Sequence, residues 1–171
     1  MKNLLNVNRV IIFLVLSSLL LSSCGFRLRG AIVVPDIMEQ VYVDGDFSAN
    51  DLGKVLFRRL TQVGVNRVAQ KELARSILRI TNNSFIRRVL TVDSATKASA
   101  YKLDIVIGFE VEDKEGKIVL KNQQVRQTRE YNVDQLNALA SGDQENRLKL
   151  EMIQFIVNQI LTRMSIVLKK Y

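Results

Sequence analysis

The alternation of residues 101–111 constrains the fold of this 171-residue chain more than any other feature. Every odd position in that stretch is apolar, while charged residues recur at the even positions. Successive side chains of a β-strand point to opposite faces, so the pattern predicts a strand with one buried and one mostly solvated face. The apolar positions are Tyr101, Leu103, Ile105, Ile107, Phe109 and Val111, and the charged ones are Lys102, Asp104, Glu110 and the following Glu112.

Further strands are predicted on both sides of this one. Asp113-Lys114-Glu115-Gly116 indicates a turn, after which residues 117–131 return as a long strand that forms a hairpin with it. Upstream, residues 77–92 have strand character on both sides of Asn82-Asn83-Ser84, and this interruption indicates a bulged or bent strand. Residues 41–43 predict one more short strand.

Two helices are predicted from capping signals and apolar spacing. Ser48 with Asp51 matches a capping box, and apolar residues then recur at helical spacing over a helix that we expect at residues 49–63. Ser141 and Gln144 repeat the capping spacing before a second helix. The wide apolar stripe of that helix comprises Leu148, Met152, Ile153, Phe155, Ile156, Ile160, Met164, Val167 and Leu168.

The order of these elements predicts the fold class. Strand-helix-strand-strand-strand-helix is an α+β arrangement, with a mainly antiparallel four-stranded sheet and both helices on one face. The other face of the sheet then remains available to a partner. We expect a single domain over residues 39–171, which is an ordinary length for one hydrophobic core.

The N-terminus has the features of an export signal. Lys2 and Arg9 precede the apolar run of residues 10–21, and Leu21-Ser22-Ser23-Cys24 follows directly. This tetrapeptide resembles the lipobox of bacterial lipoproteins, in which the cysteine thiol is diacylglycerated and the peptide is cut before it. Residues 1–23 are therefore predicted to be a signal peptide, and residues 24–38 a lipidated tether. An ordinary secretory signal that happens to end in cysteine is the alternative.

Export and composition exclude several function classes. The chain has no histidine, and its one cysteine is consumed by the lipid, so Ser-His, Cys-His and ordinary zinc sites cannot be assembled. No phosphate-cradling glycine motif occurs, and we expect no cofactor apart from the covalent lipid on Cys24. The chain is basic, with 25 Lys and Arg against 17 Asp and Glu, which suits anionic lipid; export argues against nucleic acid. A carboxylate enzyme using Asp104 or Glu110 remains an alternative to a non-enzymatic role.

Arginine and lysine residues of the predicted strands are candidates for anion binding. If the strands are neighbours, these residues form a positive patch whose guanidinium groups bind phosphate or carboxylate. A solvated sheet face with no ligand is the alternative. The residues are Arg79, Arg87, Arg88, Lys97, Arg126 and Arg129.

Several of these motifs together resemble the LptE family of lipopolysaccharide (LPS) assembly lipoproteins. They are Cys24-Gly25-Phe26-Arg27-Leu28-Arg29-Gly30, Pro35, Leu90-Thr91-Val92-Asp93, Ala100-Tyr101-Lys102-Leu103 and Ala138-Leu139-Ala140. The resemblance implies the same strand-helix-strand-strand-strand-helix fold. It also implies a plug inside the LptD β-barrel that aids LptD assembly and LPS delivery to the outer leaflet without a chemical step.

The resemblance also implies where the chain resides and where it touches LPS. Gly25 after the cysteine favours the outer membrane, on its periplasmic side. Family members contact LPS near the loop between the second and third strands and near the start of the last helix. Here the first place holds Lys97, with Arg87 and Arg88 before it, and the second holds Ser141-Gly142. The alternative function is another outer-membrane lipoprotein that activates or assembles a different cell-envelope machine.

Overall fold

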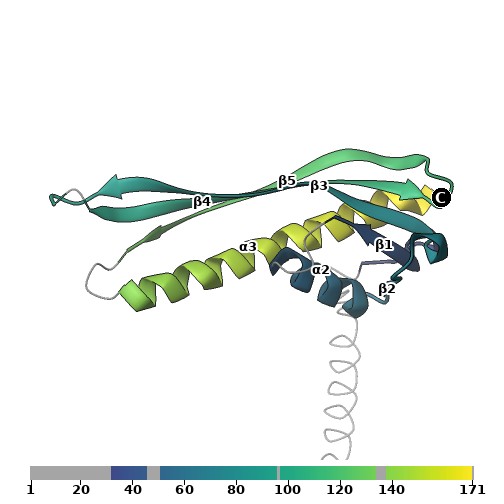
Figure 1. The fold of residues 1–171 in the computed structure, drawn as a ribbon, viewed down its shortest axis with the longest axis horizontal. Coiled ribbons are helices and arrows are strands. Elements are labelled where there is room, and N and C mark those ends of the chain that lie inside the picture. The colour runs from purple at the N-terminus through teal and green to yellow at the C-terminus, as the bar shows by residue number, and fades with distance from the viewer. Residues whose placement is uncertain (1–31, 46–50, 96, 134–137, 171) are drawn as a thin grey trace, which may run out of the picture. The chain divides into compact units, whose positions relative to one another are not determined.

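The computed structural model describes residues 32–45, 51–95, 97–133 and 138–170. Within them, one β-sheet packs against two α-helices (Figure 1). The strands are β1 Gln40–Asp44, β2 Asn66–Arg67, β3 Ser76–Val92, β4 Ala98–Asp113 and β5 Ile118–Asn132. The helices are α2 Asp51–Gln62 and α3 Ala138–Val167, with short 3₁₀ segments at Asp36–Met38, Lys71–Leu73 and Leu168–Lys170.

The sheet is mixed and has five strands in the order β2-β1-β3-β4-β5. The α+β class is confirmed, but the four-stranded count was wrong, because the two-residue β2 is too short to leave a periodic signal in the sequence. β1 runs parallel to β2 and β3, with α2 in the connection, whereas β3, β4 and β5 form an antiparallel meander.

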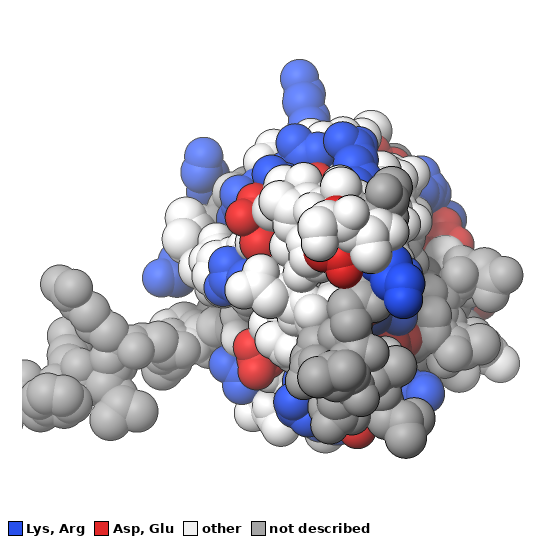
Figure 2. Space-filling view, turned by 90° about the vertical axis from the view of Figure 1, so that its left-hand side faces the viewer, with Lys and Arg blue, Asp and Glu red and all other residues white. Residues whose placement is uncertain are grey.

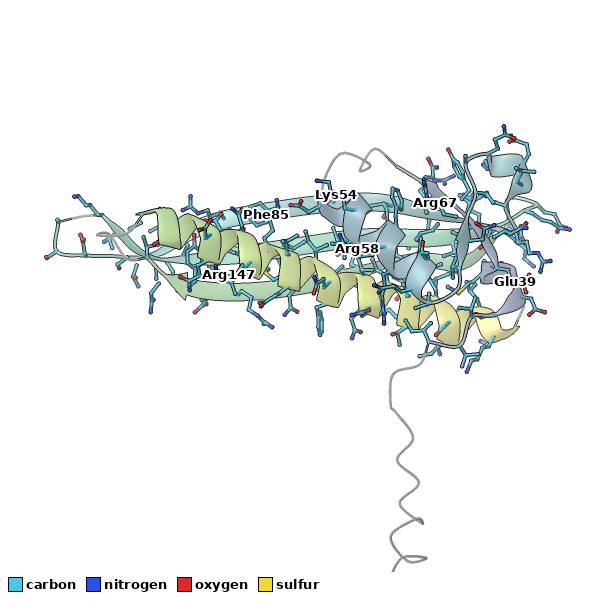
Figure 3. All side chains as sticks on the ribbon, turned by 90° about the horizontal axis from the view of Figure 1, so that it is seen from below. Glu39, Lys54, Arg58, Arg67, Phe85 and Arg147 are labelled. Atoms are coloured by element: carbon cyan, nitrogen blue, oxygen red, sulfur yellow. The ribbon has the colours of Figure 1, made fainter. Side chains whose placement is uncertain are left out.

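The core lies between the sheet and the helices, which cover the same face (Figures 1 and 3). The predicted alternation of β4 is confirmed: Leu103, Phe109 and Val111 are fully buried against the helices. The stripe of α3 is also buried for most of its length, but Phe155 was wrongly included, since 45% of it is exposed. On the opposite face of β4, Asp104 and Glu112 are buried, although the sequence pattern predicted solvated side chains there. Asp104 accepts a hydrogen bond from Thr128, and Glu112 forms an ion pair with Arg79.

β3 contains the predicted bulge. Ile80 pairs with Phe109 and Asn82 with Gly108, which leaves Thr81 as an extra residue without a partner on β4. The bulge fits closely over Gly108, because a Cβ there would lie 2.6 Å from Thr81 Oγ1. A bulge of one residue exchanges the two faces of the strand beyond it. Odd-numbered residues from Asn83 to Val89 therefore face the helices, whereas even-numbered ones do so before the bulge.

The β3–β4 and β4–β5 turns have the same hydrogen-bond pattern. Asp93 Oδ1 accepts hydrogen bonds from the backbone N–H of Ala95 and Lys97, each at 2.9 Å. Asp113 Oδ1 accepts from Glu115 at 3.0 Å and Lys117 at 2.9 Å in the same way, as local Asp turns do. The turn predicted after β4 is confirmed.

The helix boundaries differ from the prediction at one end. α3 begins at Ala138, so Ser141 lies in its first turn and is not its N-cap. The predicted first helical residue, Gly142, was therefore four residues late, since the capping pattern at Ser141 and Gln144 did not mark the boundary. α2 ends at Gln62, within one residue of the predicted end, because Gly64 has φ +85° and the N–H of Val65 returns to the carbonyl of Leu60. The predicted N-cap Ser48 lies outside the described residues.

Part of the predicted tether is also described. Met38 is fully buried, and Ile32, Val34 and Ile37 pack against the core, so the chain is attached to the domain from residue 32 onward. The predicted signal peptide, Cys24 and the tether up to residue 31 lie outside the described residues.

Candidate binding site between the outer sheet and the start of α3

The candidate site lies where the outer parts of β3, β4 and β5 face the first turns of α3. A cavity of about 420 Å³ opens there. It is lined from the strand side and the β3–β4 turn by Arg87, Lys97, Ala98, Tyr101, Tyr131 and Val133, and from α3 by Ser141, Gly142 and Glu145. The site therefore combines cationic groups and tyrosine rings from strands with the start of a helix.

Arg87 is at the centre of this arrangement because the bulge turns it toward the helices. Its guanidinium carbon lies 3.7 Å from the centre of the Tyr101 ring, and its Nε is 3.0 Å from Glu145 Oε2 on α3. The rings of Tyr101 and Tyr131 stack at 5.8 Å between centres, and the Tyr131 hydroxyl donates a hydrogen bond to Glu145. One arginine thus links three strands to α3.

The contacts within this cluster shift the pKa values of Arg87 and Tyr131. Burial alone lowers the pKa of Arg87, but a hydrogen bond with Tyr131 and the charge of Glu145 outweigh it, so the net pKa is raised. Burial, together with the hydrogen bond to Glu145, raises the pKa of the Tyr131 hydroxyl. Arg87 therefore stays cationic and Tyr131 neutral at physiological pH, and 43% of the arginine side chain is exposed for a further contact.

The structure separates the residues of the predicted basic patch. Arg87 and Lys97 line the same cavity. Arg88 follows Arg87 on a strand, so it points to the opposite face, beside Lys102 of β4. Arg126 lies on that second face as well, 3.6 Å from Asp104. The single patch expected from the sequence is two groups on different faces.

Arg79 has a structural role on the face away from the helices. Its guanidinium contacts Asp44 at 3.0 Å, Glu110 at 3.1 Å and Glu112 at 2.7 Å. The hydrogen bond to Asp44 is the main cause of a raised pKa, opposed only in part by burial. Arg79 is therefore saturated by carboxylates from β1 and β4 and is not available to an anionic ligand. The same network engages Glu110, which the sequence left as a candidate for catalysis, together with Glu112 two residues further along β4.

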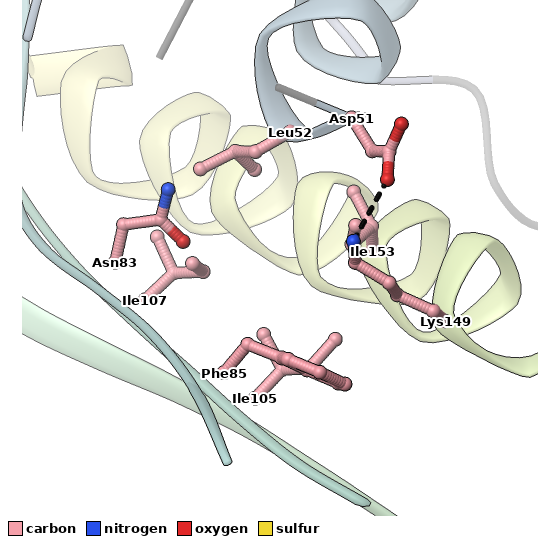
Figure 4. Close-up of a pocket in the computed structure, with 8 residues that line it drawn as sticks. All are labelled: Asp51, Leu52, Asn83, Phe85, Ile105, Ile107, Lys149 and Ile153. Atoms are coloured by element: carbon pink, nitrogen blue, oxygen red, sulfur yellow. Dashed lines mark ion pairs between the residues drawn. The ribbon is translucent and has the colours of Figure 1, made fainter. Parts of the chain in front are cut away.

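A second cavity, of about 220 Å³, opens between β3 and the helices (Figure 4). Its lining is mixed: Asn83 is polar, and the 3.0 Å ion pair between Asp51 of α2 and Lys149 of α3 lies along it. The Lys149 ammonium also lies 5.3 Å from the centre of the Phe85 ring. The apolar lining is Leu52, Phe85, Ile105, Ile107 and Ile153.

Figure 2 views the domain from the end at which β3 turns into β4 and α3 begins. Lys and Arg side chains are most numerous along the top, which is the sheet side in Figure 1, with uncharged surface between the charged groups. Among the residues that the structure describes, no three histidine, cysteine or acidic side chains are placed to hold a metal ion. No helix in the described ranges is both long and apolar enough to cross a membrane.

Sequence reasoning missed the tyrosines and Glu145. The signal was present in part, because the predicted hairpin brings the ends of its strands, Tyr101 and Tyr131, close together. Their direct pairing also depends on register shifts near Val111, which the sequence does not reveal. Glu145 could not be recognised because its partner Arg87 lies on a distant strand and no sequence pattern pairs the two.

Three solved structures share this fold. An uncharacterized lipoprotein B from Nitrosomonas europaea matches with TM-score 0.68 and 23% identity, over 82% of this chain and 90% of that one. The rare lipoprotein B of Shewanella oneidensis matches with TM-score 0.61 and 22% identity, over 74% and 93%. A minor lipoprotein of Acinetobacter baumannii gives 0.61 and 21%, over 75% and 91%. A search of curated proteins found no match.

By fold, the chain is therefore a two-layer α+β protein of the architecture found in several bacterial lipoproteins. A family model described as "LptE: Lipopolysaccharide-assembly" matches residues 38–164. The chain belongs to the LptE family of LPS-assembly lipoproteins, which confirms the resemblance inferred from the sequence. The match begins at the fully buried Met38 and ends within α3, so it spans both helices and all five strands.

Proposed function

We propose that this chain is the lipoprotein component of an outer-membrane LPS translocon. In this role it is lipidated on Cys24, lies on the periplasmic side, and partners an LptD barrel as plug, assembly aid and LPS-binding component. Family membership supports a part in LPS assembly. Two or more acyl chains on Cys24 provide a stable hold on the membrane, whereas one chain is marginal.

The observation that carries the proposal is the 420 Å³ cavity between the β3–β4 turn and α3. The family resemblance implied two separate places of LPS contact, one near that turn and one near the start of the last helix. Lys97 represents the first place, Ser141 and Gly142 the second, and all three line the same cavity together with Arg87. A single anionic ligand can therefore touch both places at once.

The chemistry of the cavity suits a phosphorylated glycolipid. The Arg87 guanidinium is a planar fork of N–H donors, and its ion pair with Glu145 uses only the Nε side. The N–H groups that Glu145 and Tyr131 leave free, together with the Lys97 ammonium, can donate to phosphate oxygens, while the tyrosine rings offer apolar surface to sugar or acyl carbons. Such a site binds its ligand without transforming it.

The partnership is tested by co-purification. The exported, tagged chain in Gram-negative cells is expected to recover a large β-barrel protein in stoichiometric amount, and depletion of the chain is expected to lower LPS at the cell surface. Recovery of the chain without any barrel, or unchanged surface LPS after depletion, would contradict the proposed function. Recovery of components of another envelope machine would favour the alternative.

LPS binding is tested with two neighbouring arginines on opposite faces. Arg87→Gln or Lys97→Gln is expected to weaken LPS binding about tenfold at low salt, since a charge-assisted hydrogen bond contributes about 1.5–3 kcal/mol and exposure reduces it. Arg88→Gln is the matched control and leaves binding unchanged, because its side chain points away from the cavity. Added salt should reduce the difference in LPS affinity between wild type and the Arg87→Gln or Lys97→Gln variant, because it screens the charges. Equal loss in all three variants would indicate a diffuse charge effect instead of this cavity.

A further inference from the structure

β3 has a long free edge. It pairs with β1 only over Ser76–Arg79, and among the described residues no strand lies beside it on that side from Ile80 to Val92. We call Ile80–Val92 the free edge. Thirteen residues at about 3.3 Å each extend for about 40 Å. In an antiparallel ladder the backbone groups of alternate residues point away from the partner strand, so this edge presents a row of N–H and C=O groups for pairing.

The free edge is also apolar, which is unusual for an unpaired strand. Large hydrophobic residues are exposed on both of its faces, instead of alternating with polar ones. They are Phe85 (41% exposed), Ile86 (39%), Val89 (54%), Leu90 (46%) and Val92 (56%). Soluble proteins blunt such edges with charges, prolines or short strands, and a long apolar edge is a site for strand addition.

The other edge of the same sheet provides a comparison. β5 has 15 residues and, among the strands that the structure describes, pairs with β4 alone, yet its only exposed large hydrophobic residue is Ile118. Its remaining exposed positions are polar or charged, among them Lys121, Arg126, Arg129 and Glu130. The β5 edge is thus charged or polar along most of its length, whereas the free edge of β3 has charges only at Arg87 and Arg88 and irregular pairing only near its two ends. This difference singles out β3 as the docking edge.

A second copy of this chain does not suit the free edge. Its only charged residues are Arg87 and Arg88, close to its middle, and it has no acidic residue. In an in-register parallel pair, or in an antiparallel pair that overlaps most of the edge, the arginines of the two copies would lie opposite or diagonal to one another. Like charges at those positions are destabilising. The charge pattern calls for an extended segment that carries carboxylates.

We propose that an extended, acidic segment of the barrel partner adds to β3 as a sixth strand, with a carboxylate opposite Arg88. No ion pair joins Arg88 to another residue that the structure describes, and its pairing with Lys102 puts it on the face that the helices leave open. The strands of a closed barrel have no free edges, so the segment is a loop or a terminal extension of the partner. This inference rests on the proposed function, because it assumes that the barrel partner exists.

Amide hydrogen exchange on the purified wild-type complex tests the proposal. Compared with the chain alone, amides within the free edge should exchange at least tenfold more slowly, and the slowing should affect every second residue, as ladder hydrogen bonds require. An intact complex without this slowing overturns strand addition and leaves the proposed function standing. Failure to recover any complex removes both. If LPS micelles alone slow exchange in the same way, the edge binds lipid and the proposal is overturned. If exchange in the free chain slows as the chain concentration rises, the edge pairs with a second copy, and the proposal is overturned as well.

Two matched variants add a test by binding. Val89→Lys places a charge on the free edge, and Ile118→Lys places one at a residue of similar exposure, 50% against 54%, on the opposite edge. Val89→Lys is expected to reduce recovery of the complex at least tenfold, while Ile118→Lys leaves it near wild type. Both should unfold at similar denaturant concentrations. Equal recovery of the two variants would contradict pairing at β3.

Discussion

Substitution of Gly108 tests the fit of the bulge that orients the outer half of β3. In Gly108→Ala the new Cβ would lie 2.6 Å from Thr81 Oγ1 and 3.1–3.2 Å from the Cβ and backbone N of Asn82. Thr81 can rotate away, which breaks its 3.0 Å hydrogen bond to Asn122 at a cost of about 0.5–1 kcal/mol. The backbone N of Asn82 cannot rotate away, so the strand itself must shift, and such overpacking costs about 1–3 kcal/mol.

Part of this cost is offset, because alanine has less conformational freedom than glycine in the unfolded chain, which stabilises the folded state by about 0.4–1 kcal/mol. The net prediction is a loss of about 2 kcal/mol in the free energy of unfolding, measured by urea titration followed by circular dichroism. Gly142→Ala is the control: this glycine is exposed in α3, nothing outside its own turn lies within 4 Å, and a gain of about 0.5–1 kcal/mol is expected. A Gly108→Ala chain as stable as wild type would refute the close fit.

Three further predictions concern the anchor and the charged contacts. Glu145→Gln removes the ion pair with Arg87, so it should cost about 0.5–1 kcal/mol in the part-exposed pair, and it should lower the raised pKa of Tyr131, measured by spectrophotometric titration; an unchanged pKa would contradict the contact. Thr128→Val removes the 2.5 Å hydrogen bond that is the main cause of the lowered pKa of Asp104. A carboxyl group with a lowered pKa in the folded state stabilises the fold at pH values above its ordinary pKa, and this stabilisation is lost as the pH falls through the folded pKa. The variant should therefore have a lower free energy of unfolding than wild type at neutral pH, and the two chains should converge in acid. Cys24→Ala should abolish incorporation of labelled palmitate while the exported chain still co-purifies with the barrel, and loss of the complex would show that the anchor is required for assembly.

The parts of the fold that repeat regularly in the sequence were predictable. β4 has an unbroken two-residue alternation, and the structure buries its odd positions as expected. The bulge in β3 was predictable in position, since three consecutive polar residues interrupt an apolar strand. Its effect on the faces was not, because the extra residue could have been any of several, and each choice assigns Arg87 and Arg88 to different faces.

The remaining differences arise from tertiary contacts. β2 has two exposed residues and owes its pairing to β1, so no local pattern marks it. The capping pattern at Ser141 predicted the wrong start for α3, and capping motifs are local preferences that the surrounding fold can override. The candidate site depends on these same features: the bulge places Arg87, and the early start of α3 places Glu145 beside it.

Two adjacent arginines illustrate how a strand divides one charge cluster between its two faces. Arg87 lies inside the cavity, pairs with Glu145 and faces Tyr101, whereas Arg88 lies on the open face next to the free edge of β3. A ligand in the cavity and a strand on the edge can therefore bind at the same time, and both would contact the same short segment of β3. Because that segment has no neighbour strand on its outer side, pairing there would hold it rigid and so fix the position of Arg87 in the cavity. The two proposals together predict that LPS binds more tightly to the complex than to the chain alone, and that Val89→Lys, which weakens strand addition, reduces the gain in LPS affinity on forming the complex.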